Sequence, residues 1–176
     1  MRMGITGYEP SFLFGIDEVR QAHGARLAAL AGRRLTGFAV VRFVEDGSWY
    51  ADCPVVLDFE GVRVEISHHD LNSFWMGWGE IDTTAALANW EWFELTPAWS
   101  DRDDRLAPFV GRELSEAALL EWCPPAESRD MARGTVAVEF RFGDDYLRIM
   151  NGLDENHVEL GPAAPEHVRY HLQLSE

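Results

Sequence analysis

The chain has 176 residues and a net charge of −15, from 30 Asp and Glu against 15 basic residues. All of the basic residues are Arg, so enzymes that need a Lys are excluded, namely the Schiff-base enzymes, the P-loop phosphotransferases and the kinases. The surplus of acids also argues against nucleic-acid binding, which needs a basic surface.

The length predicts a single domain over residues 1–176, and we expect its first segment, 1–31, to be helical. Between positions 17 and 31, apolar residues recur at helical spacing on roughly one face, namely Val19, Ala22, Leu27 and Leu30. Asp17 and Glu18 favour the start of this helix, and Gly32 is a typical stop signal.

The start of the sequence, the length of its apolar runs and its two cysteines indicate the cellular compartment. The sequence starts without an apolar leader, and no apolar run reaches the ~18 residues that a membrane span needs. We therefore expect a cytoplasmic protein in which Cys53 and Cys123 are reduced, and a disulfide between these two residues is the alternative. The use of Arg in place of every Lys is typical of a GC-rich bacterial genome.

An internal repeat is the most informative feature. Both copies open with Gly-Arg-x-Leu followed by Thr or Ser, and two strand-like segments then follow in the same order. The matched segments are 32–43 with 111–122, 55–59 with 136–140, and 62–66 with 145–149. Three matches in one order indicate a duplication, with repeats at 32–82 and 111–176 and a connector at 83–110.

Each repeat contains a predicted β-hairpin. Its two segments alternate apolar and polar residues, and the turns at 60–61 and 143–144 each contain a Gly that tolerates positive φ. The register predicts two cross-strand pairs on the solvent-facing side: Asp58 with Arg63, and Glu139 with Arg148.

The remaining segments complete the predicted fold. We expect a second helix over 83–93, a charged connector over 99–105, and a closing strand over 166–174 with Val168 and Tyr170 facing inward. The fold class is α+β. It is mainly antiparallel β, with two pseudo-symmetric meander repeats that form a sandwich or a barrel, and an N-terminal helix.

Motifs of known chemistry are missing from the sequence. It contains no Gly-x-Ser-x-Gly, no Gly-x-Gly-x-x-Gly and no Cys-x-x-Cys. His68 and His69 point to opposite faces if they are neighbours on a strand, and His167 and His171 would lie about 13 Å apart. We therefore predict no metal and no cofactor, and the sequence favours a protein without enzymatic activity.

The charge is concentrated in the predicted β-region. Residues 1–44 carry six Arg and three acids, a charge of +3, whereas residues 45–176 carry nine Arg and 27 acids, a charge of −18. This asymmetry predicts a non-catalytic binding protein that recognises a basic protein partner. The candidate partner-binding residues are Asp101, Asp103, Asp104, Asp144, Asp145, Asp154 and Glu155.

Two other interpretations remain open at this point. The aromatic residues could line a cavity between the repeats, which would give a small-molecule-binding protein or an enzyme. The candidate pocket residues are Trp75, Trp78, His68 and His69. The third interpretation is a structural subunit that forms a homodimer through an open sheet edge. None of the three interpretations involves nucleic acid or a membrane.

The Gly-Arg-x-Leu starts, the hairpin ends Val-Glu-Ile and Leu-Arg-Ile, and the segment 151–156 (Asn-Gly-Leu-Asp-Glu-Asn) resemble small acidic β-rich bacterial proteins. Some of those proteins are grouped with the immunity proteins of toxin systems. The resemblance covers about residues 32–160 and rests on turns and strands. It implies a protein that neutralises a toxin, commonly a basic one, and it assigns no functional residue.

Overall fold

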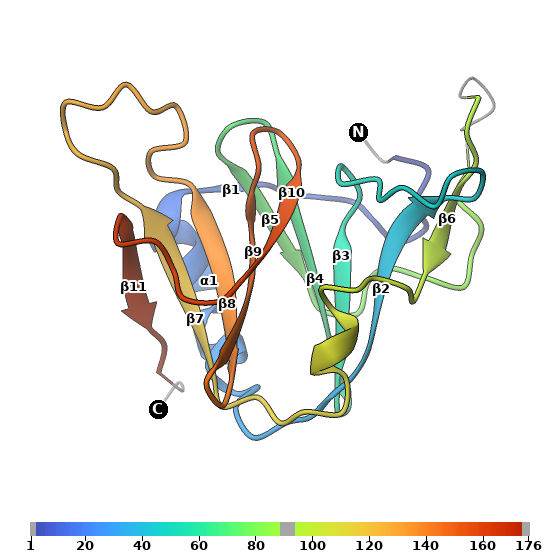
Figure 1. The fold of residues 1–176 in the computed structure, drawn as a ribbon, viewed down its shortest axis with the longest axis horizontal. Helices are drawn as coiled ribbons and strands as arrows, with labels where there is room; N and C mark the ends of the chain where they lie inside the picture. Colours follow the sequence, from blue (N-terminus) through green and yellow to red (C-terminus); the bar gives the residue numbers. More distant parts are fainter. Residues whose placement is uncertain (1–2, 89–93, 174–176) are drawn as a thin grey trace.

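The computed structural model describes residues 3–88 and 94–173. In these residues, two antiparallel sheets pack face to face as a sandwich and do not close into a barrel (Figure 1). The first sheet has the order β1-β5-β4-β3-β2-β6 and the second has the order β10-β9-β8-β7-β11. The fold class predicted from the sequence is therefore confirmed, and the choice between sandwich and barrel is resolved.

The strands of the first sheet come from the N-terminal segment, the first repeat and, for β6, the segment predicted as a connector. They are β1 (Leu13–Phe14), β2 (Leu35–Phe43), β3 (Val55–Phe59), β4 (Val62–His69), β5 (Ser73–Gly77) and β6 (Pro97–Ser100). The strands of the second sheet are β7 (Glu116–Trp122), β8 (Val136–Phe142), β9 (Asp145–Asn151), β10 (Asn156–Leu160) and β11 (His167–His171).

The two repeats share one topology. In each, four strands form a meander, and a fifth strand returns to pair with the outer edge of the first strand, as β6 does with β2 and β11 with β7. The returning chain crosses the outer face of its own sheet in both copies. The described parts of these crossovers are residues 78–88 and 94–96 in the first copy and residues 161–166 in the second (Figure 1).

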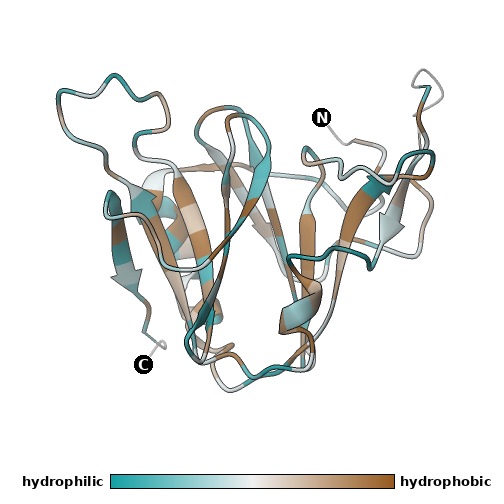
Figure 2. Cartoon of the chain, viewed as in Figure 1, coloured by the Kyte–Doolittle hydropathy of each residue, from teal (hydrophilic) through white to brown (hydrophobic). Residues whose placement is uncertain are grey.

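The core lies between the sheets. Alternate residues of β3, β4, β8 and β9 point inward and are almost fully buried, including Leu57, Phe59, Phe140 and Ile149. Figure 2 shows the corresponding apolar stripes along these strands, with hydrophilic residues gathered in the loops. Period-2 patterning therefore produced the inward face that the sequence predicted.

The helix α1 (Gly15–Ala28) closes one side of the sandwich against β7. Val19, Leu27 and the following Leu30 are buried there, whereas Ala22, which the helical spacing also placed inward, is exposed. The Glu18 carboxylate accepts a hydrogen bond from the backbone N–H of Phe14 at 2.8 Å, which satisfies a donor at the start of the helix.

Both predicted cross-strand pairs form, but their burial was predicted wrongly. Asp58 lies opposite Arg63 and Glu139 opposite Arg148. The first pair is half-buried, and the side chains of Glu139 and Arg148 are completely buried. The cause is the crossovers, which cover the outer face of each sheet and remove these side chains from water.

Each pair also holds its crossover in place. Arg63 Nη1 donates to the Ile81 carbonyl at 3.1 Å, and Arg148 Nη1 donates to the Gly161 carbonyl at 3.3 Å. The same cross-strand acid–Arg pair therefore performs the same task in both repeats. In the first sheet, Glu65 adds to it by accepting the backbone N–H of Ile81 at 2.8 Å.

Several local predictions were wrong in the connector and at the closing strand. Residues 83–88 form turns and irregular chain instead of a helix, and the rest of that predicted helix lies outside the described residues. Trp99, assigned to a charged connector, lies in β6, and the 3-10 helix η1 (Ala107–Phe109) follows. In β11, Tyr170 packs on the core, but Val168 is 44% exposed.

Candidate acidic binding site

Three loops meet at one end of the sandwich. They are residues 44–54 between β2 and β3, the turn 70–72 between β4 and β5, and the turn 152–155 between β9 and β10 (Figure 1). The backbones of Asp70 and Asp154 form an isolated antiparallel β-bridge, which places the turns of the two repeats side by side. We call these three loops the acidic rim.

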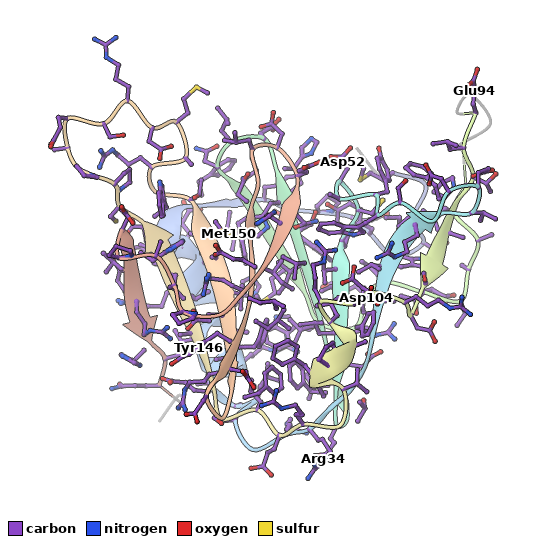
Figure 3. The ribbon with its side chains drawn as sticks, in the orientation of Figure 1. Arg34, Asp52, Glu94, Asp104, Tyr146 and Met150 are labelled. Carbon is purple, nitrogen blue, oxygen red and sulfur yellow. The ribbon has the colours of Figure 1, made fainter. Side chains whose placement is uncertain are left out.

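The acidic rim carries six acids and no Arg. The acids are Glu45, Asp46, Asp52, Asp70, Asp154 and Glu155. Figure 3 shows Asp52 at this end of the molecule and Arg34 at the opposite end. At the opposite end, acids and Arg residues neutralise one another, as in the ion pair between Arg112 and Asp145 at 2.9 Å. The rim loops therefore contain acids and no Arg of their own, and the Arg residues that contact them, Arg42 at the Gly47 carbonyl and Arg105 on the Trp49 ring, lie on the side of β6.

Hydrogen bonds lower the pKa of two acids of the rim. Hydrogen bonds to Thr96 lower the pKa of Glu45, and hydrogen bonds to Ser48 lower the pKa of Asp46. Because carboxylates with a lowered pKa remain charged, these two positions contribute fixed negative charge.

Asn151 ties the two turns together from below. Its side-chain oxygen accepts the backbone N–H groups of Leu153 at 2.9 Å and Asp154 at 3.2 Å, and its amide nitrogen donates to the Asp70 carbonyl at 2.8 Å. Asn151 is 7% exposed, so these bonds form away from water, where polar groups need partners.

Asn156 ties the turns to the third loop. Its Nδ2 donates to the carbonyls of Ala51 at 3.0 Å and Cys53 at 2.9 Å, and its Oδ1 accepts the backbone N–H of His68 at 2.9 Å. All of these groups lie beneath the rim, and Asn156 is 1% exposed. The two asparagines that flank the turn 152–155 thus hold the rim loops in one arrangement, as a preformed binding site requires.

The His68 imidazole is part of the same buried network. Its Nδ1 lies 3.0 Å from Asn156 Oδ1 and its Nε2 lies 2.9 Å from the Val136 carbonyl oxygen. Burial lowers the pKa of His68, although the hydrogen bonds to Asn156 and Val136 oppose this effect. The ring is therefore neutral at pH 7 and donates one hydrogen bond, to one of these two acceptors.

This network predicts a pH dependence of stability. Below the ordinary pKa of about 6.5, the unfolded chain takes up a proton at His68 that the folded protein does not, so the free energy of unfolding should fall with pH by at most ~1.4 kcal/mol per unit. Urea unfolding at about pH 7.5 and about pH 5.5 checks this expectation. The loss should be smaller in a His68→Gln variant, and an equal loss in both proteins would contradict it.

The structure separates the seven acids predicted to bind a partner. Asp154 and Glu155 lie on the rim, whereas Asp144 and Asp145 lie at the far end of β9, about 20 Å away by strand length. Asp101 and Asp104 are exposed beside β6, and Figure 3 shows Asp104 away from the rim. Only two of the seven therefore belong to this site.

Asp103, the seventh of these acids, is a structural residue. It is 3% exposed, and its carboxylate pairs with Arg42 at 2.9 Å and Arg105 at 2.6 Å. Burial opposes its ionisation, but the hydrogen bonds and charges of Arg105 and the charge of Arg42 hold the pKa of Asp103 below its usual range. It is not accessible to a partner.

The four predicted pocket residues do not meet in one cavity. His68 faces the core between the sheets, and His69 lies on the other face of β4, where it stacks on Phe12. Trp75 packs edge-on against Tyr8 on the outer face, and Trp78 donates to His23 of α1 at 3.1 Å. The alternation of strand side chains thus distributes the four residues over both faces of the sheet.

Two open surface clefts lie on the described part of the molecule. One, of about 470 Å³, runs beside β6, includes Arg42 and Trp99, and reaches the rim loop 44–54 at Val44 and Gly47. The other lies between α1 and the end of β11 and includes Gln21 and His171. In the first cleft, Arg42 is committed to Asp103, to the Arg102 carbonyl at 2.6 Å and to Gly47, so it braces the fold.

Features of specific chemistry are not found in the described part of the chain. Within residues 3–88 and 94–173, no group of three His, Cys, Asp or Glu side chains is arranged to hold a metal ion. Cys53 is buried, Cys123 is half-buried, and both are free thiols. No helix among the described residues is long and apolar enough to cross a membrane.

Comparison of the chain with protein-family models, with curated proteins and with solved structures finds no match.

Reasoning from the sequence missed the residues that organise the rim. Asn151, Asn156 and Asp70 act through contacts between the two repeats, and Leu153 stands out by its conformation. The available signal was the segment Asn-Gly-Leu-Asp-Glu-Asn, in which two Asn flank a turn, but its pairing with residues near 51 and 70 depends on the fold.

Proposed function

We propose that this chain is a non-catalytic binding protein that recognises a basic protein partner through the acidic rim. One observation carries the proposal: the rim segments that contain Asp52, Asp70, Asp154 and Glu155 are tied into one preformed surface by Asn151 and Asn156. An acidic surface of this kind attracts a basic partner and fixes its orientation. Neutralisation of a basic toxin, which the immunity-like resemblance implies, is one function of this kind.

Three substitutions test the proposal with little effect on folding. Asp70 and Asp154 have positive φ, which Asn tolerates, and both are exposed, as is Glu155. The rim variant is Asp70→Asn, Asp154→Asn, Glu155→Gln. The matched control, Asp101→Asn, Asp104→Asn, Asp144→Asn, removes the same charge at exposed positions outside the rim.

Peptides selected from a random-peptide phage library against the immobilised wild type serve as the probe. We expect Arg- and Lys-rich peptides whose affinity falls at least ~10-fold for the rim variant and less than ~3-fold for the control. Their affinity for the wild type should also fall as salt rises, because screening weakens the attraction between exposed charges. Equal losses in the two variants would show that only net charge matters and would refute the proposal.

A further inference from the structure

Resting on the proposed function, we infer that Leu153 is the apolar anchor of the acidic rim and inserts into an apolar recess of a basic protein surface. Leu153 lies at the tip of the turn between β9 and β10, where Gly152 N–H donates to the Glu155 carbonyl at 2.8 Å. Asp154 follows it in the turn. The backbone of Asp70, in the neighbouring turn, forms an isolated β-bridge with the backbone of Asp154. An exposed apolar side chain is thus followed in its turn by two acids, Asp154 and Glu155, and Asp70 lies across the bridge from Asp154.

Leu153 is unfavourable for the folded protein in two independent respects. Its side chain is 55% exposed, so burial contributes little, and its φ is +69°. Asp154 has a φ of +77°, so both central residues adopt the positive φ of a type I′ turn, in which Asn, Asp and Gly are favoured. A Leu at the first of these positions is strained by its Cβ, and Asn would fit better.

The other exposed apolar residues lack this combination. Among the described residues, positive φ at a non-glycine position occurs at Met3, Asp70, Leu153 and Asp154, and only Leu153 of these is a large exposed hydrophobic. Val44 and Met131 are more exposed but are not in this conformation. Leu71, in the corresponding turn of the first repeat, is half-buried. Single exposed apolar residues are common in folded proteins. An exposed apolar residue whose backbone is also strained does not stabilise the fold, so its side chain needs another explanation.

The surroundings of Leu153 define the partner. Protein interfaces commonly have a desolvated apolar centre inside a polar border, and the energy is concentrated in a few anchors. Here the border is made of Asp70, Asp154 and Glu155. The complementary surface is therefore an apolar recess bordered by Arg or Lys side chains. Because Asn151 fixes the turn from below, little order has to be gained when the anchor binds.

The experiment measures stability and binding on the same variants, with the selected basic phage peptides as the probe. Leu153→Asn should raise Tm by about 2–4 °C, because it relieves the strained turn, and should weaken peptide binding at least ~10-fold. Leu153→Met keeps an apolar side chain and should bind within about threefold of the wild type. The peptides should contain an aliphatic or aromatic residue beside their basic residues.

The outcomes distinguish this inference from the proposed function. If Leu153→Asn binds as tightly as the wild type while the rim variant loses binding, the anchor is refuted and the acidic rim stands. If Leu153→Asn lowers Tm, Leu153 serves the fold and the inference is overturned. If neither Leu153→Asn nor the rim variant changes binding, both the anchor and the proposed function fail.

Discussion

Replacement of Arg148 by Ala should lower the free energy of unfolding by about 3–5 kcal/mol. Arg148 is fully buried, and its guanidinium pairs with Glu139 at 2.6 Å and with Glu159 at 2.6 Å. Removal of the cation leaves the buried Glu139 with only Arg169 as its partner among the described residues and leaves the Gly161 carbonyl without this donor. The crossover 161–166 then loses its side-chain attachment through Arg148 and keeps the backbone hydrogen bonds at its two ends, and urea unfolding would detect the loss of stability.

The first repeat supplies the matched control. Arg63 makes the corresponding contacts with Asp58 and Ile81, but the side chains of Arg63 and Asp58 are 28% and 33% exposed. Water therefore compensates part of the loss, and Arg63→Ala should cost about 1 kcal/mol. Equal costs at the two positions would contradict the view that burial under the crossover sets the strength of the pair.

Replacement of Asn156 by Leu should lower the free energy of unfolding by about 3 kcal/mol or more. Leu has the same number and branching of side-chain heavy atoms, but it accepts no hydrogen bond from the His68 N–H and donates none to the Ala51 and Cys53 carbonyls. These groups are beneath the rim, so they would stay unsatisfied or admit water. Amide hydrogen exchange should then increase in the loop 44–54 before it increases in the core strands.

Asn72→Ala is the control for this variant. Asn72 is exposed in the turn between β4 and β5, next to the same loops, and its loss should change stability by less than about 0.5 kcal/mol. If Asn156→Leu were as mild as Asn72→Ala, the buried amide would not be what holds the rim together.

The sequence predicted the features that depend on neighbouring residues. The hairpin registers of Asp58 with Arg63 and Glu139 with Arg148 follow from period-2 alternation and a Gly-containing turn, both of which are local. The burial of Glu139 was not predictable in this way, because it depends on the crossover 161–166. The strand β6 was missed for the same reason, since it is four residues long and pairs with β2 far away in the chain.

For the candidate site, too, the sequence predicted the local features but not those that depend on long-range contacts. Its acidic character was visible in the composition, and Asp154 and Glu155 were identified from it. The position of the site was not visible, because charge alone does not distinguish Asp154 from Asp144 at the other end of β9. Asp103 was misassigned because only the fold brings Arg42 and Arg105 to its carboxylate. Long-range contacts, and not residue type, decide which acids remain free to bind.

Backbone amide chemical shifts of the labelled wild-type protein, titrated with a selected basic peptide, test the central claim most directly. The proposed function predicts that the shifts that change most belong to the acidic rim, in residues 44–54, 70–72 and 152–155 (Figure 3). Changes confined to residues 98–104 beside β6 or to the groove between α1 and β11, with the rim unaffected, would contradict it.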